Sequence, residues 1–333
     1  MAGWSCRCPD AANAVPALPY PSNTAPIFKV EVNTNPGIPG LLTVDAWGSH
    51  EASAALSFGT FGNYNRIKAS LGLVRALPIP PVATVTAGGT VEFAGANSKI
   101  VNADQKTGFT VHAGTPVLNA TAAEIAADAS MAARIANNAA NAELSGAAGS
   151  VGGAVSVIES DADLKNLGQG VATARSPAPV DFFRSTFGMD SDTYRSQPAA
   201  VRIACPAGDC TSGDVNGIVA ANPGRVIWVD GDLNLNSAAN LGTPGQPVMM
   251  LATGKITLSS VVNINGFVYS DKDIVWTATA AGSVLRGALM AKGDFRAASA
   301  VVAIYDSAMM QRISLGYGSF ARLPGSWQVL PIQ

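Results

Sequence analysis

Residues 27–77 alternate between apolar and polar positions, as β-strands with one buried face do. Turn residues, among them Asn35-Pro36-Gly37 and Gly62-Asn63, separate the alternating stretches. The pattern predicts an antiparallel meander, and the proline-rich stretch 78–81 follows it as a stiff linker. Strands are expected at residues 27–33, 41–47, 54–58 and 66–77.

The last third of the chain contains an internal repeat in which each copy follows a short apolar strand. The copies are residues 229–235, 252–258, 270–276 and 291–297. The aligned positions Gly231, Gly254, Lys272 and Gly293 are 23, 18 and 21 residues apart. A period of about 20 residues built from short strands and tight turns is typical of a β-solenoid, whose successive turns stack.

The repeat also predicts the role of individual positions. The glycines Gly231, Gly254 and Gly293 are expected at a corner with positive φ, which glycine adopts without strain. The side chains two places later are expected to point inward and to stack on one another. These are Leu233, Ile256, Ile274 and Phe295.

The middle of the chain differs from both ends. Short glycine-ended strands at 87–95 and 109–114 resemble the repeat. Thr121-Ala122-Ala123-Glu124 matches a capping box and predicts an Ala-rich helix to about Leu144. Shorter helices are expected at 160–167, with Gly168 as C-cap, and at 181–188, whose phenylalanines should dock on the main body.

The predicted fold class is mainly β. It is a right-handed parallel β-helix, or solenoid, with an N-terminal antiparallel strand region and an Ala-rich helical insertion. The predicted domains are a strand region at 1–80, the first solenoid strands at 81–118, a helical insertion at 119–200, and a solenoid body with a C-terminal cap at 201–327.

Charge and hydropathy exclude several classes of protein. Charged residues make up 13% of the chain, and 21 basic residues face 23 acidic ones. Disorder requires a higher charge, and a nucleic-acid binder would show clustered Lys and Arg. No apolar run reaches the roughly 18 residues of a membrane-spanning helix, and the first 30 residues lack a signal-peptide pattern. The chain as given is therefore expected to be soluble.

The four cysteines form two local pairs. Cys205 and Cys210 bracket a Pro-x-Gly turn that can bring them within bridging reach, so a disulfide is predicted, with two free thiols as the alternative. Cys6 and Cys8 pair with each other, with another chain, or not at all. A disulfide places a protein outside the cytoplasm.

Carboxylates recur along the repeat and are the strongest candidates for chemistry. Aspartate commonly bonds its own backbone in turns, and Lys255 replaces it in the second copy, so a structural role is favoured. Calcium binding is the main alternative, and a glycosidase or lyase would need paired carboxylates in a groove. The five residues are Asp230, Asp232, Asp271, Asp273 and Asp294.

No other catalytic or cofactor pattern stands out. His50 and His112 are too isolated to indicate a triad or a metal site, and Gly88-Gly89 and Gly152-Gly153 match no phosphate-binding loop. We therefore predict no enzyme activity, no cofactor and no metal. Buried strand residues are more common than sugar-stacking platforms, so a core role is favoured for the aromatics Trp228, Trp276 and Trp327.

Several segments together resemble PilX-type pilus assembly proteins, which are minor pilins of Gram-negative type IV pilus systems. They are the strand pattern at 27–77 and the segments Ala87–Phe93, Asp181–Met189, Val226–Leu233 and Phe320–Trp327. The resemblance implies a prepilin leader and an N-terminal hydrophobic helix that anchors the subunit in the inner membrane. This sequence has neither, which we interpret as truncation to the soluble head.

The leading hypothesis is therefore a non-enzymatic head domain that acts through its surfaces in pilus biogenesis or adhesion. The resemblance implies other pilins and pilus-tip or assembly proteins as partners, no nucleic acid, and a membrane link only through the absent helix. It implies a location in the periplasm, at the inner membrane and in the fibre at the cell surface. The alternatives are a secreted carbohydrate-binding or carbohydrate-active β-helix protein and a cytoplasmic polymerising scaffold, which the cysteine pairs disfavour.

Overall fold

The computed structural model describes residues 27–38, 40–49, 65–95, 98–102, 109–119, 123–126, 157–170, 181–205, 209–278 and 282–330. The chain divides into two compact units. The smaller unit comprises Met1–Leu73 and Phe320–Gln333, and the larger comprises Val74–Ser319. The strand expected at 54–58 lies outside the described residues.

The smaller unit contains an antiparallel sheet. Its strands are β1 (Ile27–Thr34), β2 (Leu41–Ser49), β3 (Asn65–Arg75), β23 (Gly318–Arg322) and β24 (Gln328–Leu330). The order is β1-β2-β3-β23, and β24 also pairs with β3. The meander predicted from the alternation is confirmed for β1, β2 and β3. The two C-terminal strands, which the sequence did not assign to this sheet, complete it.

The larger unit is built on parallel strands. One set is β4 (Val85–Ala87), β6 (Ser98–Asn102), β7 (Val111–Ala113), β9 (Ala123–Ala126), β10 (Val157–Ile158), β11 (Ala200–Ala204), β13 (Val226–Asp230), β15 (Ala239–Leu241), β16 (Val248–Ala252), β18 (Val262–Ser270), β20 (Val284–Ala291) and β22 (Val302–Tyr305). They form a 12-stranded sheet with the main order β10-β7-β4-β20-β18-β16-β13-β11. A mainly β chain with parallel sheets and an N-terminal antiparallel sheet is confirmed.

A second parallel sheet has seven short strands. They are β5 (Val91–Phe93), β8 (Val117–Leu118), β12 (Cys210–Thr211), β14 (Leu233–Leu235), β17 (Ile256–Leu258), β19 (Ile274–Trp276) and β21 (Phe295–Ala297), in the order β12-β14-β17-β19-β21-β5-β8. Their first residues are register partners along the whole sheet. The predicted inward stacking is confirmed, because Leu233, Ile256, Ile274 and Phe295 are successive register partners and their side chains are all buried. We call this stack of first residues the inward column.

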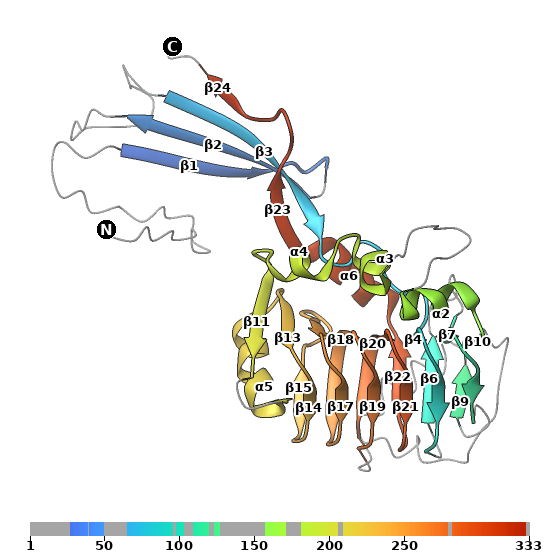
Figure 1. Ribbon diagram of the computed structural model, residues 1–333. Helices are drawn as coiled ribbons and strands as arrows, with labels where there is room; N and C mark the ends of the chain where they lie inside the picture. The colour runs from blue at the N-terminus through green and yellow to red at the C-terminus, as the bar shows by residue number, and fades with distance from the viewer. Residues whose placement is uncertain are drawn as a thin grey trace. The chain divides into compact units, whose positions relative to one another are not determined.

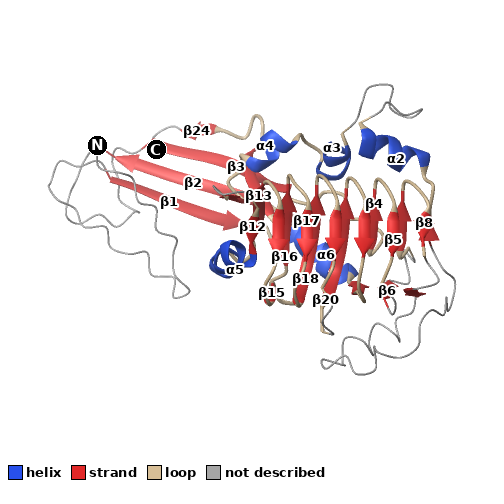
Figure 2. Ribbon diagram, turned by 60° about the horizontal axis from the view of Figure 1, so that its bottom comes forward, coloured by secondary structure: helices blue, strands red, loops and turns tan. Residues whose placement is uncertain are grey.

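The sheets join parts of the chain that are far apart in sequence. Strand β20 pairs with β4, and β21 pairs with β5, so the repeat of the last third continues directly into the strands near residue 90 (Figures 1 and 2). The glycine-ended strands at 87–95 and 109–114 are therefore part of the same stack. Their likeness to the repeat was visible in the sequence, whereas their place beyond its last copy was not.

The long strands β18 and β20 bend at glycines that the sequence analysis did not single out. Gly266 has φ +151° and Gly287 has φ +132°, and the two are register partners. A Cβ on Gly287 would lie 1.8 Å from the carbonyl oxygen of Gly266. Both the positive φ and the close approach of the neighbouring backbone therefore require glycine at this bend.

The predicted role of the repeat glycines needs correction. Gly231 has φ +117°, but Gly254 and Gly293 do not have positive φ. A Cβ on Gly254 would lie 2.0 Å from Oδ1 of Asp232, and one on Gly293 would lie 2.1 Å from Oδ1 of Asp273. These two positions are glycine because the preceding repeat's carboxylate occupies the space of a side chain.

Within the residues that the structure describes, the larger unit has the helices α2 (Ala162–Gln169), α3 (Phe182–Phe187), α4 (Ser191–Arg195), α5 (Ser212–Ala221) and α6 (Ser307–Gly316). Helix α3 lies within the expected range 181–188, with Asp181 as N-cap and Gly188 as C-cap, and its phenylalanines are buried as expected. Helix α2 is capped by Gly170 and not by Gly168. Gly168 instead allows close packing, since its Cβ would lie 2.8 Å from the carbonyl oxygen of Lys292.

The Ala-rich helix expected to begin near Thr121 is wrong at its start. Residues Ala123–Ala126 form β9, which pairs in parallel with β6. Helix propensity is a weak preference that tertiary pairing overrides, and here four residues gain a strand partner. The remainder of the expected helix, to Leu144, lies outside the described residues.

Two hydrophobic cores stabilise the larger unit. One lies on the inner face of the parallel sheets and contains, for example, Ile227, Val229 and Leu233. The other lies between the 12-stranded sheet and the helices, and contains Trp228 and Phe183. Figure 1 shows α2, α3, α4 and α6 along one side of the strands. Because both faces of strands such as β13 and β16 are buried, these strands appear in the sequence as continuous apolar runs.

Candidate functional site

Three aspartates of the repeat hold the backbone of the next repeat. The N–H of Lys255 donates to Oδ1 of Asp232 (2.7 Å), and the N–H of Asp294 donates to Oδ1 of Asp273 (2.8 Å). The N–H of Thr90 donates to Oδ1 of Asp294 (2.6 Å). These aspartates do bond backbone N–H groups, as the structural interpretation expected. The bonded N–H groups belong to the neighbouring repeat, however, and not to the aspartate's own turn.

The other two aspartates bind side chains. Asp230 accepts hydrogen bonds from Nη2 of Arg202 (2.6 Å) and from Nε1 of Trp228 (2.8 Å). Asp271 accepts from the hydroxyl of Tyr269 (3.0 Å) and lies 3.2 Å from Nζ of Lys292. All five carboxylates therefore have partners that account for them without a ligand.

The Asp230 cluster predicts a pH-dependent stability. Partial burial would raise the pKa of Asp230, but hydrogen bonds from Arg202 and Trp228, and the charges of Arg202 and Arg195, outweigh it and hold the pKa below 3.8. The ionised carboxylate thus stabilises the fold above that pH, and this stabilisation is lost as the pH falls through the lowered pKa. We expect Asp230→Asn to lose about 1–2 kcal/mol at pH 7, and the difference from wild type to close as the pH falls through the lowered pKa of Asp230.

Urea unfolding between pH 7 and pH 2.5 measures this difference. Asp209→Asn is the matched control, because Asp209 is exposed. A deficit in Asp230→Asn that stayed constant over the whole pH range would show that the carboxylate's charge contributes nothing.

The candidate metal and aromatic residues have structural roles where the chain is described. In those ranges, no three His, Cys, Asp or Glu side chains lie together as metal ligands would. His112 bonds Asp161, the N-cap of α2, with Nε2 2.8 Å from Oδ2. His50 lies outside the described residues. Trp228 and Trp276 are buried in the cores, whereas Trp327 is half exposed beneath the guanidinium of Arg322.

The structure joins Cys205 and Cys210 in a disulfide, with Cα atoms 5.3 Å apart. Cys210 is fully buried and is the first member of the inward column, followed by Leu233. The bridge therefore ties Cys205, which directly follows β11, to β12 at the end of the seven-stranded sheet. Such a bond is consistent with an extracytoplasmic location. Cys6 and Cys8 lie outside the described residues.

The antiparallel sheet of the smaller unit has one apolar face. Residues opposite each other in antiparallel strands share a face. Val30, Ala46, Ile67 and Val329 form one such row across four strands. Val32, Val44 and Ala69 form the next row. The valines at both edges are exposed, with 52% for Val30, 59% for Val32 and 63% for Val329. We call these two rows the apolar sheet face.

The opposite face of this sheet is polar. The guanidinium of Arg66 bonds Oδ1 of Asp45 (2.9 Å) and lies 5.2 Å from the ring centroid of Trp47. Asp45 in turn is the register partner of Glu31 and Lys68. The two faces of one sheet therefore differ sharply, and the charged one is internally paired.

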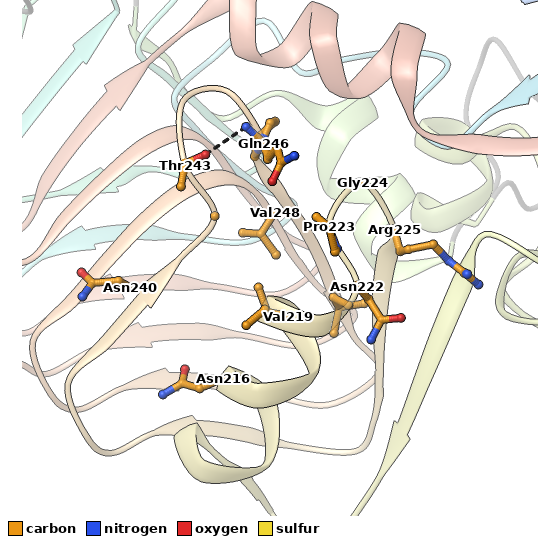
Figure 3. A pocket seen from close by; sticks show the side chains of 14 residues that line it. Asn216, Val219, Asn222, Pro223, Gly224, Arg225, Asn240, Thr243, Gln246 and Val248 are labelled. Atoms are coloured by element: carbon orange, nitrogen blue, oxygen red, sulfur yellow. Dashed lines mark hydrogen bonds between the residues drawn. The ribbon is translucent and has the colours of Figure 1, made fainter. Parts of the chain in front are cut away.

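A small cavity of about 210 Å³ lies in the larger unit, beside α5. Its walls come from α5, from the turn at Asn222–Arg225, and from residues 240–248 (Figure 3). Figure 3 shows Asn216 and Asn240 on one side, Asn222 and Pro223 on the other, and Val219 and Val248 between them. This group is not recognisable in the sequence, since asparagines scattered over residues 216–240 form no motif.

No family profile matches the sequence, and no curated protein is similar to it. Among solved structures, the chain is similar to the competence-associated pilin ComZ of Thermus thermophilus. The identity is 10% and the TM-score 0.26, over 92% of this chain and 83% of that one. A likeness at this level establishes neither fold nor function, and it does not support the PilX type in particular.

No helix in the described ranges has the length and apolar character needed to cross a membrane.

Proposed function

We propose that this chain is a non-enzymatic structural or assembly subunit of a type IV pilus system, with the role of a minor pilin head. Its partners are other pilins and pilus-tip or assembly proteins, and its place is the periplasm, the inner membrane and the fibre at the cell surface. The resemblance of its segments to PilX-type proteins supports the assignment, and the Cys205–Cys210 disulfide agrees with it.

The observation that carries the proposal is the apolar sheet face. Contiguous exposed apolar surface on a soluble protein marks a site of contact with another protein or a membrane. Here Val30, Val32 and Val329 are more than half exposed, on a sheet whose other face is polar and internally paired. A protein that works by assembly requires such a surface.

We propose further that the parallel sheets of the larger unit are the faces of a right-handed parallel β-helix. One support is the constant register from β13 through β16, β18 and β20. Another is the bend in β18 and β20, since the two parts of each strand pair with different strands. The first part of β20 pairs with β22, and its second part pairs with β4. A stiff body of this kind suits a subunit that presents surfaces and performs no chemistry.

The test compares two adjacent positions on β1 that point to opposite faces. Val32→Glu places a charge on the apolar sheet face, whereas Asn33→Glu places the same charge on the polar face. In the source bacterium, surface fibres are sheared off and this protein is quantified in them by immunoblot. We expect wild type and Asn33→Glu in the fibre fraction, and a loss of about tenfold or more for Val32→Glu. One unpaired charge in an interface costs more than the tenfold equivalent of 1.4 kcal/mol.

Thermal melts of the purified variants show whether folding is equal, since both substituted positions are exposed. Absence of the wild-type protein from sheared fibres and from the pilus-assembly complexes of the cell envelope would overturn the proposed role. Equal fibre content of the two Glu variants would show that the apolar sheet face is not the contact surface.

A further inference from the structure

The cavity beside α5 has an apolar wall. Val219 of α5 faces Val248, the first residue of β16 (Figure 3), and Ile227 of β13 also lines the cavity. Val248 and Ile227 belong to the inner core of the parallel sheets. Strands of the core therefore hold this wall in place, and it does not depend on the turn at Asn222–Arg225 alone.

Amide groups flank this wall and retain bonding capacity. Among the described residues, Oδ1 of Asn216 is buried and has no hydrogen-bond partner. Oδ1 of Asn240 accepts a hydrogen bond from Nδ2 of Asn263 (3.1 Å), so the amide nitrogen of Asn240 can still donate to a ligand. Nδ2 of Asn222 donates to the carbonyl oxygen of Ile218 (2.9 Å), so Oδ1 of Asn222 can still accept from a ligand. A buried polar atom without a partner is costly, so the Asn216 amide favours an occupant that bonds it.

The lining is electrically neutral where it faces the cavity. Arg225 is the one charged residue in the part of the lining that the structure describes. Its guanidinium points away from the cavity in Figure 3 and donates to the carbonyl oxygens of Pro198 and Ala199. An anionic or cationic ligand would meet no counter-charge here, and a charged group without one is disfavoured in such a site.

We propose that this cavity binds a small neutral polyhydroxylated molecule, namely a single sugar residue. A sugar ring has an apolar face that fits the Val219–Val248 wall, and hydroxyls that both donate to and accept from amides. The volume of about 210 Å³ is below the roughly 300–1,000 Å³ of sites for drug-sized ligands. It therefore suits one ring and not an oligosaccharide. Sugar binding here does not require the assembly role proposed above.

Two neighbouring alanines of α5 provide a matched test. Ala220 lines the cavity and Ala221 does not, and both are exposed, so a tryptophan at either position is expected to leave the fold intact. Saturation-transfer-difference NMR on the full chain is performed separately with glucose, galactose, mannose and N-acetylglucosamine. We expect at least one sugar to bind wild type with a Kd in about the millimolar range.

We expect Ala220→Trp to abolish that signal and Ala221→Trp to keep it. Asn216→Leu, which removes the unpartnered amide, should weaken binding by about 3- to 10-fold, the equivalent of one neutral hydrogen bond. The absence of a signal from all four sugars with wild type would overturn the proposal. An equal signal in the two tryptophan variants, whether kept or lost, would overturn it as well.

Discussion

Replacing Ile256 by aspartate is expected to unfold the larger unit or nearly so. Ile256 is completely buried, and its register partners in the inward column are Leu233 on one side and Ile274 on the other. The change removes apolar burial and places a carboxyl group where it has no hydrogen-bond partner. We expect a loss of at least about 5 kcal/mol, which is comparable to the whole stability of an ordinary domain.

The control for this change lies one residue away. Thr257 points outward from the same strand β17, so Thr257→Asp should cost less than about 1 kcal/mol, the range of β-propensity differences. Thermal and urea melts of both variants measure the difference. Similar small losses in both would contradict the inward column and, with it, the parallel β-helix.

The second large effect is expected at Gly287. In Gly287→Ala the new Cβ would overlap the carbonyl oxygen of Gly266, at 1.8 Å, in a backbone with φ +132° that L-residues rarely adopt. Strain in φ and overpacking each cost about 1–3 kcal/mol, so we expect a loss of about 3–5 kcal/mol. Denaturant unfolding of the purified chain tests this value.

Gly217→Ala makes the same substitution where neither constraint applies. Gly217 lies within α5, and a Cβ there would have no neighbour within 4 Å. Alanine is the better helix former, so this variant should gain about 0.5–1 kcal/mol. If Gly287→Ala kept or gained stability, as Gly217→Ala is expected to do, the backbone geometry at Gly287 would be refuted.

The fold was predictable wherever a local pattern repeats. Alternation located β1, β2 and β3, and the 20-residue repeat placed Leu233, Ile256, Ile274 and Phe295 in one column. Corner geometry was not predictable from the same alignment. Gly254 and Gly293 align with Gly231, yet they are glycine because an aspartate of the preceding repeat lies against them. A sequence alignment records that a side chain is missing but does not record why.

Long-range pairing was the main part that the sequence could not supply. Nothing in residues 85–93 indicates that their partners are residues 289–297, since parallel pairing leaves no turn between the strands. Helices α4, α5 and α6 were also missed. The cap residues Asp190, Thr211 and Asp306 were a usable signal for them.

The candidate surfaces differ in how far the sequence indicates them. The apolar sheet face follows from alternation once the register is known, because Val30, Val32, Val44 and Ala46 fall on one side. The polar side of the same sheet follows equally. The cavity does not, because its asparagines come from α5, from the turn that follows it and from β15, and only folding brings them together.

The junction between β20 and β4 has a consequence for biosynthesis. A ribosome produces chains from the N-terminus, so residues 85–118 emerge long before residues 284–297, which contain the partner strands β20 and β21. Until then β4 and β5 have no β20 or β21 beside them, and their apolar residues Val85, Val91 and Phe93 lack half of their final surroundings. Chains interrupted before residue 284 therefore release an incomplete stack with open edges, the form most prone to aggregate. The order of the strands in space thus makes completion of this protein depend on its last 50 residues, 284–333.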